Sequence, residues 1–191
     1  MKVAVDTKEK IIAIATDLFR KKGYLGVGLS ELLKVCELSK GAFYHHFPAG
    51  KEELLITCLR TMNKMITNDM KKIFAQYDTT TEAIDNMLSE LIRQYERDKV
   101  IIGYTFNSIV SEMGSVSEVV RQTCEESYDA IQAIYQEKLS ADGFSHQQAS
   151  DQALLLNATI EGAIMLSLTK HSSIPLQTVA RLLSISTHQH K

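Results

Sequence analysis

The scarcity of residues that interrupt helices is the feature that most limits how this chain can fold. Only 9 of its 191 residues are glycine and 2 are proline. A sheet of many strands needs such residues at its turns, whereas the Leu, Ala, Glu, Lys and Gln that dominate here favour helices. The sequence therefore predicts an all-α fold.

Hydrophobic periodicity predicts about nine helices. A capping-box-like pair, Asp6 and Glu9, begins the first apolar run, and Gly23 ends it. Two short helices follow, at 29–35 and 39–46, and the three residues between them leave room only for a tight helix-to-helix turn. Longer helical runs are expected at about 51–76, 81–98, 101–113, 117–141, 146–170 and 175–187. We expect a small three-helix domain over residues 1–50 and a larger helical domain over 51–191.

The charge of the chain is unevenly distributed. The net charge is −2, but residues 1–56 carry +2 and the remainder carries −4. The weakly basic surface therefore belongs to the N-terminal part of the chain. A charge of +2 does not by itself indicate a nucleic-acid partner, because basic surface patches are common.

Cysteine usage and apolar stretches limit the classes of protein further. Cys36, Cys58 and Cys124 are odd in number and far apart, without the spacing of metal ligands, so we expect buried thiols and neither a metal nor a cofactor. No basic and apolar leader opens the sequence, and polar residues interrupt the most apolar stretch, 153–168. We therefore expect a cytoplasmic protein without a membrane span.

Residues 39–47 have two distinct faces when they are placed on a helix. Phe43 and Phe47 are four residues apart and share an apolar face, while Lys40, Tyr44 and His45 lie elsewhere. A lysine, a tyrosine and a histidine can bind phosphates or base edges in a major groove, and a glycine such as Gly41 permits close backbone approach. Periodicity alone favours an ordinary amphipathic surface helix.

The complete N-terminal pattern closely resembles the DNA-binding domain of the TetR family. The resemblance covers about the first fifty-five residues and rests on 15–19, Gly23-Tyr24, Leu32, Ser39-Lys40-Gly41, 44–47 and 51–54. It implies a helix-turn-helix repressor that binds operator DNA as a homodimer and releases it when a small molecule binds. The DNA-binding residues that it implies are Ser30, Ser39, Lys40, Gly41, Tyr44, His45, His46 and Lys51. Lys51 matches a phosphate-binding lysine, and its place beside the free N–H groups of a helix start suits that role.

Three departures from the family pattern have structural consequences. Val27-Gly28 replaces a hydroxyl pair that usually opens the second helix, so one phosphate contact is lost, although glycine still serves as a helix cap. Glu37 replaces the usual turn glycine, at a cost on the order of 1 to 2 kcal/mol if the backbone is left-handed there. The insertion Pro48-Ala49-Gly50 is one residue longer than usual. It resembles the branch of multidrug-efflux and flavonoid-responsive repressors, as do residues 160–162 and 164–168.

The C-terminal part contains no recognisable catalytic constellation. Its histidines, which are His146, His171, His188 and His190, lack partners at useful spacing, and no nucleophile elbow or phosphate-binding loop is present. We therefore expect no enzyme activity. Two alternatives to a ligand-responsive repressor stay open: an enzyme or small-molecule carrier with structural N-terminal helices, and a DNA-binding dimer without an effector.

Several residues are candidates for binding an apolar or aromatic effector. Tyr95, Phe106, Met113, Tyr128 and Met165 lie on apolar faces, where filling the core and lining a pocket are equally consistent with the pattern. Asn157 and Glu161 are four residues apart on an otherwise apolar helix and need polar partners if they are buried. They fit either a ligand cavity or a dimer interface.

The family resemblance also implies that the last two long helices form a four-helix interface with a second subunit. Ala158 and Gly162 would permit close helix approach there. Leu176, Val179 and Leu183 form an apolar stripe on the last helix and complete the predicted interface.

Overall fold

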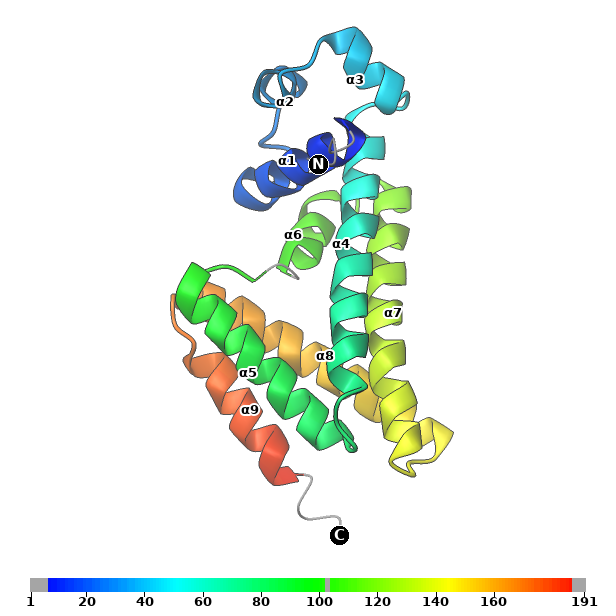
Figure 1. Cartoon of the computed structure of the whole chain (residues 1–191), viewed down its shortest axis with the longest axis vertical. Coiled ribbons are helices and arrows are strands. Elements are labelled where there is room, and N and C mark those ends of the chain that lie inside the picture. The colour runs from blue at the N-terminus through cyan, green and yellow to red at the C-terminus, as the bar shows by residue number, and fades with distance from the viewer. Residues whose placement is uncertain (1–6, 102–103, 187–191) are drawn as a thin grey trace, which may run out of the picture. The chain divides into compact units, whose positions relative to one another are not determined.

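The computed structural model in Figure 1 describes residues 7–101 and 104–186. These residues form nine α-helices and no strand, as the composition and the hydrophobic periodicity predict. The helices are α1 (Thr7–Lys22), α2 (Leu29–Cys36), α3 (Lys40–His46), α4 (Lys51–Phe74), α5 (Thr80–Asp98), α6 (Tyr104–Met113), α7 (Glu118–Ala141), α8 (His146–Thr169) and α9 (Ile174–Ser186).

The chain forms two compact units. Unit 1 combines the residues up to Asn63 with Thr105–Ser127, and unit 2 contains Lys64–Tyr104 and the residues from Tyr128 onward. Helices α4 and α7 each contribute to both units, while α6 belongs to unit 1 with α1 to α3. The division expected at residue 50 therefore differs from the compact units, because it falls inside unit 1.

Local sequence signals account for the helix ends in unit 1. Gly23 ends α1 with a φ of 71°, in the left-handed region that glycine adopts readily. Glu37 is also left-handed, with φ 57° and ψ 42°, and its N–H closes the end of α2 on the carbonyls of Leu33 and Lys34. The strained turn expected at Glu37 is thus present. The predicted start at Asp6 lies outside the described residues.

The core of unit 1 fixes the orientation of α3. Phe19 of α1, Leu32 of α2, Phe43 of α3 and Leu54 of α4 are all fully buried, and so is Phe47 at the end of α3. The ring centroids of Phe43 and Phe47 lie 5.7 Å apart. Because these two rings enter the core together, the opposite face of α3 is turned to solvent.

In unit 2, α9 packs against both α5 and α8, as seen at the lower left of Figure 1. Capping boxes begin α5, at Thr79 and Glu82, and α8, at Ser145 and Gln148. The buried Tyr95 of α5 reaches α8, where its hydroxyl donates to the carbonyl oxygen of Ser167 at 3.0 Å.

Helix α8 is the one described helix that is long and apolar enough to cross a membrane. Its Ala153, Ile160 and Ile164 side chains are buried in the core of unit 2. Core helices of helical domains have this composition as well, so the length and hydropathy of α8 carry no argument for a membrane span.

Candidate nucleic-acid interface

Helix α3 presents a polar face to solvent opposite its buried phenylalanines. Lys40, Gly41, Tyr44 and His45 are exposed, and Tyr44 retains 39% of its accessible surface. Ser39 caps the helix, its hydroxyl accepting the N–H of Ala42 at 3.1 Å. The two faces expected from the sequence are thus present, and the exposed face carries a cation, hydroxyl groups and an imidazole.

Gly41 leaves an open space on this exposed face. A Cβ atom added there would meet nothing within 4 Å, and its backbone does not lie in the left-handed region. The fold of the free protein therefore does not require glycine at this position. A requirement for glycine would have to come from a partner that approaches α3 closely.

The start of α2 is a second exposed polar surface. Gly28 occupies the cap position in extended conformation and provides no side-chain hydrogen bond, so it serves as the cap that the sequence predicted. The hydroxyl of Ser30 is exposed in the first turn. The first N–H groups of a helix without a side-chain cap can bind water or an anion.

Lys51 is directed into the protein. Its ammonium nitrogen donates to the carbonyl oxygens of Tyr24 at 2.9 Å and Val27 at 2.8 Å, and lies 3.9 Å from the centroid of the Tyr24 ring. Burial lowers the pKa of Lys51, and the negative charge of Glu112 opposes that shift. Two of the three ammonium donors are thus used within the protein.

Glu112 of α6 contacts the same segment, and the sequence reasoning missed it. Its carboxylate accepts the N–H of Tyr24 at 2.7 Å and the N–H of Leu25 at 3.3 Å. Nearly ninety residues separate these partners along the chain. A half-exposed glutamate near the end of a helix carries no sequence signal that would reveal such a contact.

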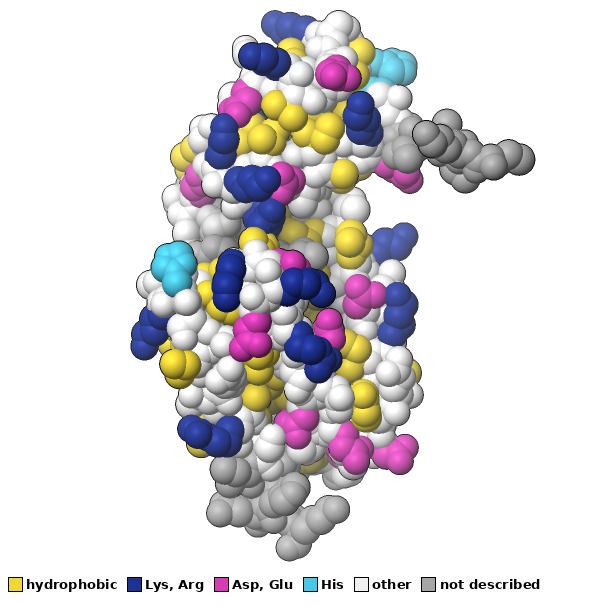
Figure 2. Space-filling view, turned by 60° about the vertical axis from the view of Figure 1, so that its left-hand side comes forward, with side chains coloured by type: hydrophobic (Ala, Val, Ile, Leu, Met, Phe, Trp, Pro, Cys, Tyr) yellow, Lys and Arg dark blue, Asp and Glu magenta, His cyan; other side chains and the backbone are white. Residues whose placement is uncertain are grey.

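Acidic and basic side chains are mixed on the face of the protein that Figure 2 draws. Figure 2 shows Lys and Arg intermingled with Asp and Glu over the face that it draws, rather than gathered in one continuous basic patch. The small excess of positive charge in residues 1–56 agrees with that distribution. A polyanion bound here would depend on a few well-placed cations such as Lys40.

The seven residues expected to bind an effector are divided between the two compact units. Phe106 and Met113 are buried in unit 1, whereas Tyr95, Tyr128, Asn157 and Glu161 belong to unit 2. Asn157 is buried, which places it on the inner side of α8.

Met165 has a different environment from the one expected. It is 44% exposed on the outer side of α8, so it does not fill the core, and its part in effector binding stays a prediction. On α8 it lies eight residues after Asn157, more than two helical turns further along the helix.

Tyr135 is an interior polar group that the sequence reasoning did not select. Its ring is buried, 5.7 Å from the ring of Phe74, and its hydroxyl lies 3.8 Å from the sulfur of Met87, which is a weak acceptor. Burial raises the pKa of Tyr135, and the charge of Glu161 adds to the shift. A negative charge on Glu161 thus disfavours the ionised form of Tyr135. The apolar spacing of Ile131, Tyr135 and Leu139 is the signal that could have indicated it.

The outer surface of α8 and α9 differs in part from the predicted dimer interface. Leu176 is completely buried, and Val179 and Leu183 pack partly buried against the same core. The apolar stripe on α9 therefore covers the protomer's own core, and the assignment of Leu176 to an interface between subunits is corrected.

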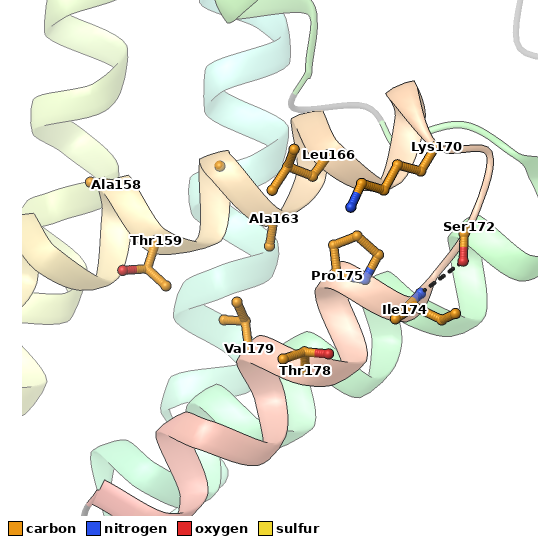
Figure 3. Close-up of a pocket in the computed structure, with 11 residues that line it drawn as sticks. Ala158, Thr159, Ala163, Leu166, Lys170, Ser172, Ile174, Pro175, Thr178 and Val179 are labelled. Atoms are coloured by element: carbon orange, nitrogen blue, oxygen red, sulfur yellow. Dashed lines mark hydrogen bonds between the residues drawn. The ribbon is translucent and has the colours of Figure 1, made fainter.

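The side chains that do face outward form an apolar surface. Ala158 is exposed and Gly162 half-buried on α8, and a groove of about 620 Å³ runs between α8 and α9 (Figure 3). Pro175, Thr178 and Val179 line it from α9. Leu166 and Ile174 line it too and are exposed, and the same two helices expose Leu155, Met165 and Leu182.

The cysteines and histidines contribute no further site in the part of the chain that the structure describes. All three cysteines are free and buried, and burial raises the pKa of Cys58 to about 12 and that of Cys124 to about 11. The described residues include no group of three or more His, Cys, Asp or Glu side chains that could hold a metal. His188 and His190 lie outside the described residues.

Comparison with known proteins decides the family. Residues 11–58 match the model of the tetR family of bacterial regulatory proteins, and residues 80–182 match that of the C-terminal domain of LmrA/YxaF-like transcriptional regulators. The chain is 36% identical to the HTH-type transcriptional regulator LmrA of Bacillus subtilis over 171 residues, which are 90% of this chain and 91% of that protein. The chain belongs to the TetR family.

Further relatives of this TetR-family regulator agree with that assignment. It is 32% identical over 180 residues to YxaF of Bacillus subtilis, which carries the name of an HTH-type transcriptional regulator, with 94% of each chain covered. The crystal structure of the reduced form of Escherichia coli NemR has the same fold, with a TM-score of 0.85, 24% identity and coverage of 94% of this chain and 95% of that one. The protein is a helix-turn-helix transcriptional regulator.

Proposed function

We propose that this TetR-family regulator is a cytoplasmic repressor that binds a pseudo-palindromic operator as a homodimer and releases it when an apolar or aromatic molecule binds. The observation that carries the proposal is that α3 has a buried face and an exposed polar face. Phe43 and Phe47 anchor the helix in the core. Lys40, Tyr44 and His45 face solvent. A regulatory role of this kind requires no catalysis, in keeping with relatives that are named as transcriptional regulators.

The exposed face of α3 lies in the major groove in this proposal. Lys40 binds phosphate or guanine, Tyr44 and His45 bind phosphate, and Ser30, Ser39 and His46 contact the backbone at the groove edges. Gly41 lets the helix approach the DNA closely. None of these side chains is needed in the core, so each can be replaced without creating a cavity.

Salt dependence tests this assignment. Lys40→Ala should weaken operator binding and, if Lys40 binds a phosphate, reduce the slope of log K against log salt by about 0.9. Lys64→Ala, which removes an exposed lysine from the middle of α4, serves as the control and should leave the slope unchanged. Equal affinities and slopes for Lys40→Ala and the native protein would refute the placement of α3 on DNA.

The homodimer forms through the outer surface of α8 and α9 in this proposal. Ala158 and Gly162 let two copies of α8 approach closely, and the exposed apolar side chains around the groove in Figure 3 become buried. Dimerisation provides two recognition helices for two half-sites, which need a separation of roughly 34 to 36 Å.

Charged substitutions on this surface test the dimer. Ala158→Glu and Gly162→Arg should give monomers in sedimentation experiments and lose tight operator binding, although α2 and α3 are unchanged. Ser89→Glu places a charge on an exposed position of α5 and serves as the control. If the Ala158 and Gly162 variants stay dimeric, the subunits meet elsewhere.

The effector binds in the interior of unit 2 in this proposal. The hydroxyl of Tyr135 there is paired with a thioether, so a ligand oxygen would replace a weak acceptor with a strong one. Asn157 and Glu161 on α8 provide further polar groups among apolar and aromatic side chains, a combination typical of small-molecule sites. Tyr95 and Tyr128 complete the lining from unit 2.

Calorimetry with a panel of planar aromatic compounds, including a flavonoid, tests this site. Binding should be weaker in the presence of operator DNA, typically by 5-fold to 150-fold, because coupling between two ligands is reciprocal. Tyr135→Phe should weaken compound binding while operator affinity without compound stays unchanged. Absence of binding across the panel would favour a DNA-binding dimer without an effector.

A further inference from the structure

A lysine and a glutamate hold the loop between α1 and α2: the lysine binds backbone carbonyl oxygens, and the glutamate binds backbone N–H groups. Lys51 of α4 donates to the carbonyl oxygens of Tyr24 and Val27, and Glu112 of α6 accepts the N–H groups of Tyr24 and Leu25. Tyr24 is thus bound at both its N–H and its carbonyl. Hydrogen bonds to charged groups are the stronger class, so this arrangement restricts the loop.

The position of this loop determines where α2 begins. Val27, whose carbonyl binds Lys51, directly precedes Gly28, the cap of α2. Gly28 provides no side-chain cap of its own, and the first turn of α2 with Ser30 is exposed. A shift of the loop would therefore move the N-terminus of α2, which lies on the DNA-binding side in the proposed function.

The two charged residues come from different segments of the chain. Lys51 falls within the match to the tetR family model, residues 11–58, whereas Glu112 falls within the match to the C-terminal model, residues 80–182. The contact is close, because a Cβ atom added at Gly23 would lie 2.5 Å from a carboxylate oxygen of Glu112. A residue outside the helix-turn-helix thus holds the loop that leads into it.

We propose that Glu112 and Lys51 are positioning residues for operator binding, which clamp the Tyr24–Val27 loop and thereby set the placement of α2 on DNA. In this inference, which rests on the proposed DNA-binding function, the main role of Lys51 is to hold the loop rather than to bind a phosphate. Because Glu112 belongs to α6, operator affinity depends on the position of α6.

Glu112→Gln distinguishes this role from a simple electrostatic effect. Removing a negative charge from a DNA-binding unit raises DNA affinity if charge alone matters. The clamp predicts that operator affinity changes in the opposite direction and falls about tenfold. The reason is that the amide NH2 group of glutamine cannot accept an N–H. Glu126→Gln removes the same charge from an exposed position of α7 and should leave affinity unchanged or slightly raised. An increase in operator affinity for Glu112→Gln would overturn the proposal.

Salt titration of Lys51→Met examines the second half of the clamp. Operator affinity should again fall about tenfold at every salt concentration, with the salt slope essentially unchanged. Lys51→Arg, which keeps a cationic donor, should restore part of the affinity. A slope reduced by about 0.9 for Lys51→Met would show instead that Lys51 acts as a direct phosphate contact.

Amide hydrogen exchange tests the clamp without DNA, so its outcome does not depend on the proposed function. Leu25 is 65% exposed, and its N–H is held by Glu112. In Glu112→Gln the amide oxygen can still accept one of the two N–H groups, so exchange at Tyr24 or at Leu25 should accelerate tenfold or more, while amides inside α1 keep their protection. Unchanged exchange at both amides would refute the clamp. Faster exchange with native operator affinity would refute only its positioning role.

Discussion

Substitution of Gly41 by alanine should separate folding from DNA binding. Gly41 is the second residue of α3, its Cβ position is empty, and its backbone conformation suits any residue. In a helix interior, replacing glycine by alanine raises the free energy of unfolding by roughly 0.5 to 1 kcal/mol. Gly41 lies near a helix end, so we expect the free energy of unfolding to rise by about 0.5 kcal/mol. For a chain of this size, that gain corresponds to a rise in Tm of about 1 to 2 °C.

Operator binding should change in the opposite direction. The added methyl group projects from the face that carries Lys40 and Tyr44, where the proposed function places DNA in close contact with the backbone. A loss of affinity of tenfold or more is expected, equivalent to at least about 1.4 kcal/mol.

Two measurements on the same preparation check this prediction, with thermal unfolding giving stability and fluorescence anisotropy with a labelled operator giving affinity. Ser89→Ala, on an exposed position of α5, serves as the control and should bind operator like the native protein. If Gly41→Ala binds operator as tightly as the native protein, the exposed face of α3 does not lie against DNA. If Gly41→Ala is less stable than the native protein, the Cβ position at Gly41 is not open.

Three further predictions concern the core, the start of α2 and the thiols. Phe47→Ala empties a fully buried position and should lower the free energy of unfolding by about 3 to 5 kcal/mol in chemical denaturation; a loss below 1 kcal/mol would contradict the packing of α3. Gly28→Ser restores a side-chain cap in an open space, so stability should rise by a few tenths of a kcal/mol, and weaker operator binding would count against a phosphate at the start of α2. The pKa of Cys58 is raised to about 12 from an ordinary 9.0, so this thiol is neutral at pH 8. Because all three cysteines are buried, Ellman's reagent should react with none of them in the native protein and with three in guanidinium. The same shift means that stability is intact below about pH 9 and falls as pH rises toward 12, because the unfolded chain releases its proton first.

The fold follows from the sequence because its signals are local. The scarcity of glycine and proline, the apolar periodicity and the stop signal at Gly23 depend only on neighbouring residues, and the helices lie close to the predicted ranges. The two faces of α3 are also local, because Phe43 and Phe47 are one helical turn apart. Even the strained turn at Glu37 was visible as a departure from a local pattern.

Contacts between distant segments could not be predicted in the same way. A stripe on α9 looks the same whether it covers its own core or a second subunit, and for this reason Leu176 was assigned to the wrong surface. The exposure of Met165 could not be predicted for a similar reason, because α8 is apolar on its inner side and its outer side alike. The bonds of Glu112 to Tyr24 and Leu25 depend on how α6 packs, which no local pattern encodes.

Selection of binding sites from random double-stranded DNA tests the central claim most directly. The account predicts an enriched inverted repeat with half-site centres one helical turn, about 34 to 36 Å, or a multiple of that apart, bound by one dimer and bound at least about 1,000-fold more tightly than unrelated DNA. Lys40→Ala and Tyr44→Ala should fail to enrich this sequence. No enrichment by the native protein, or a single asymmetric site bound by a monomer, would contradict the account.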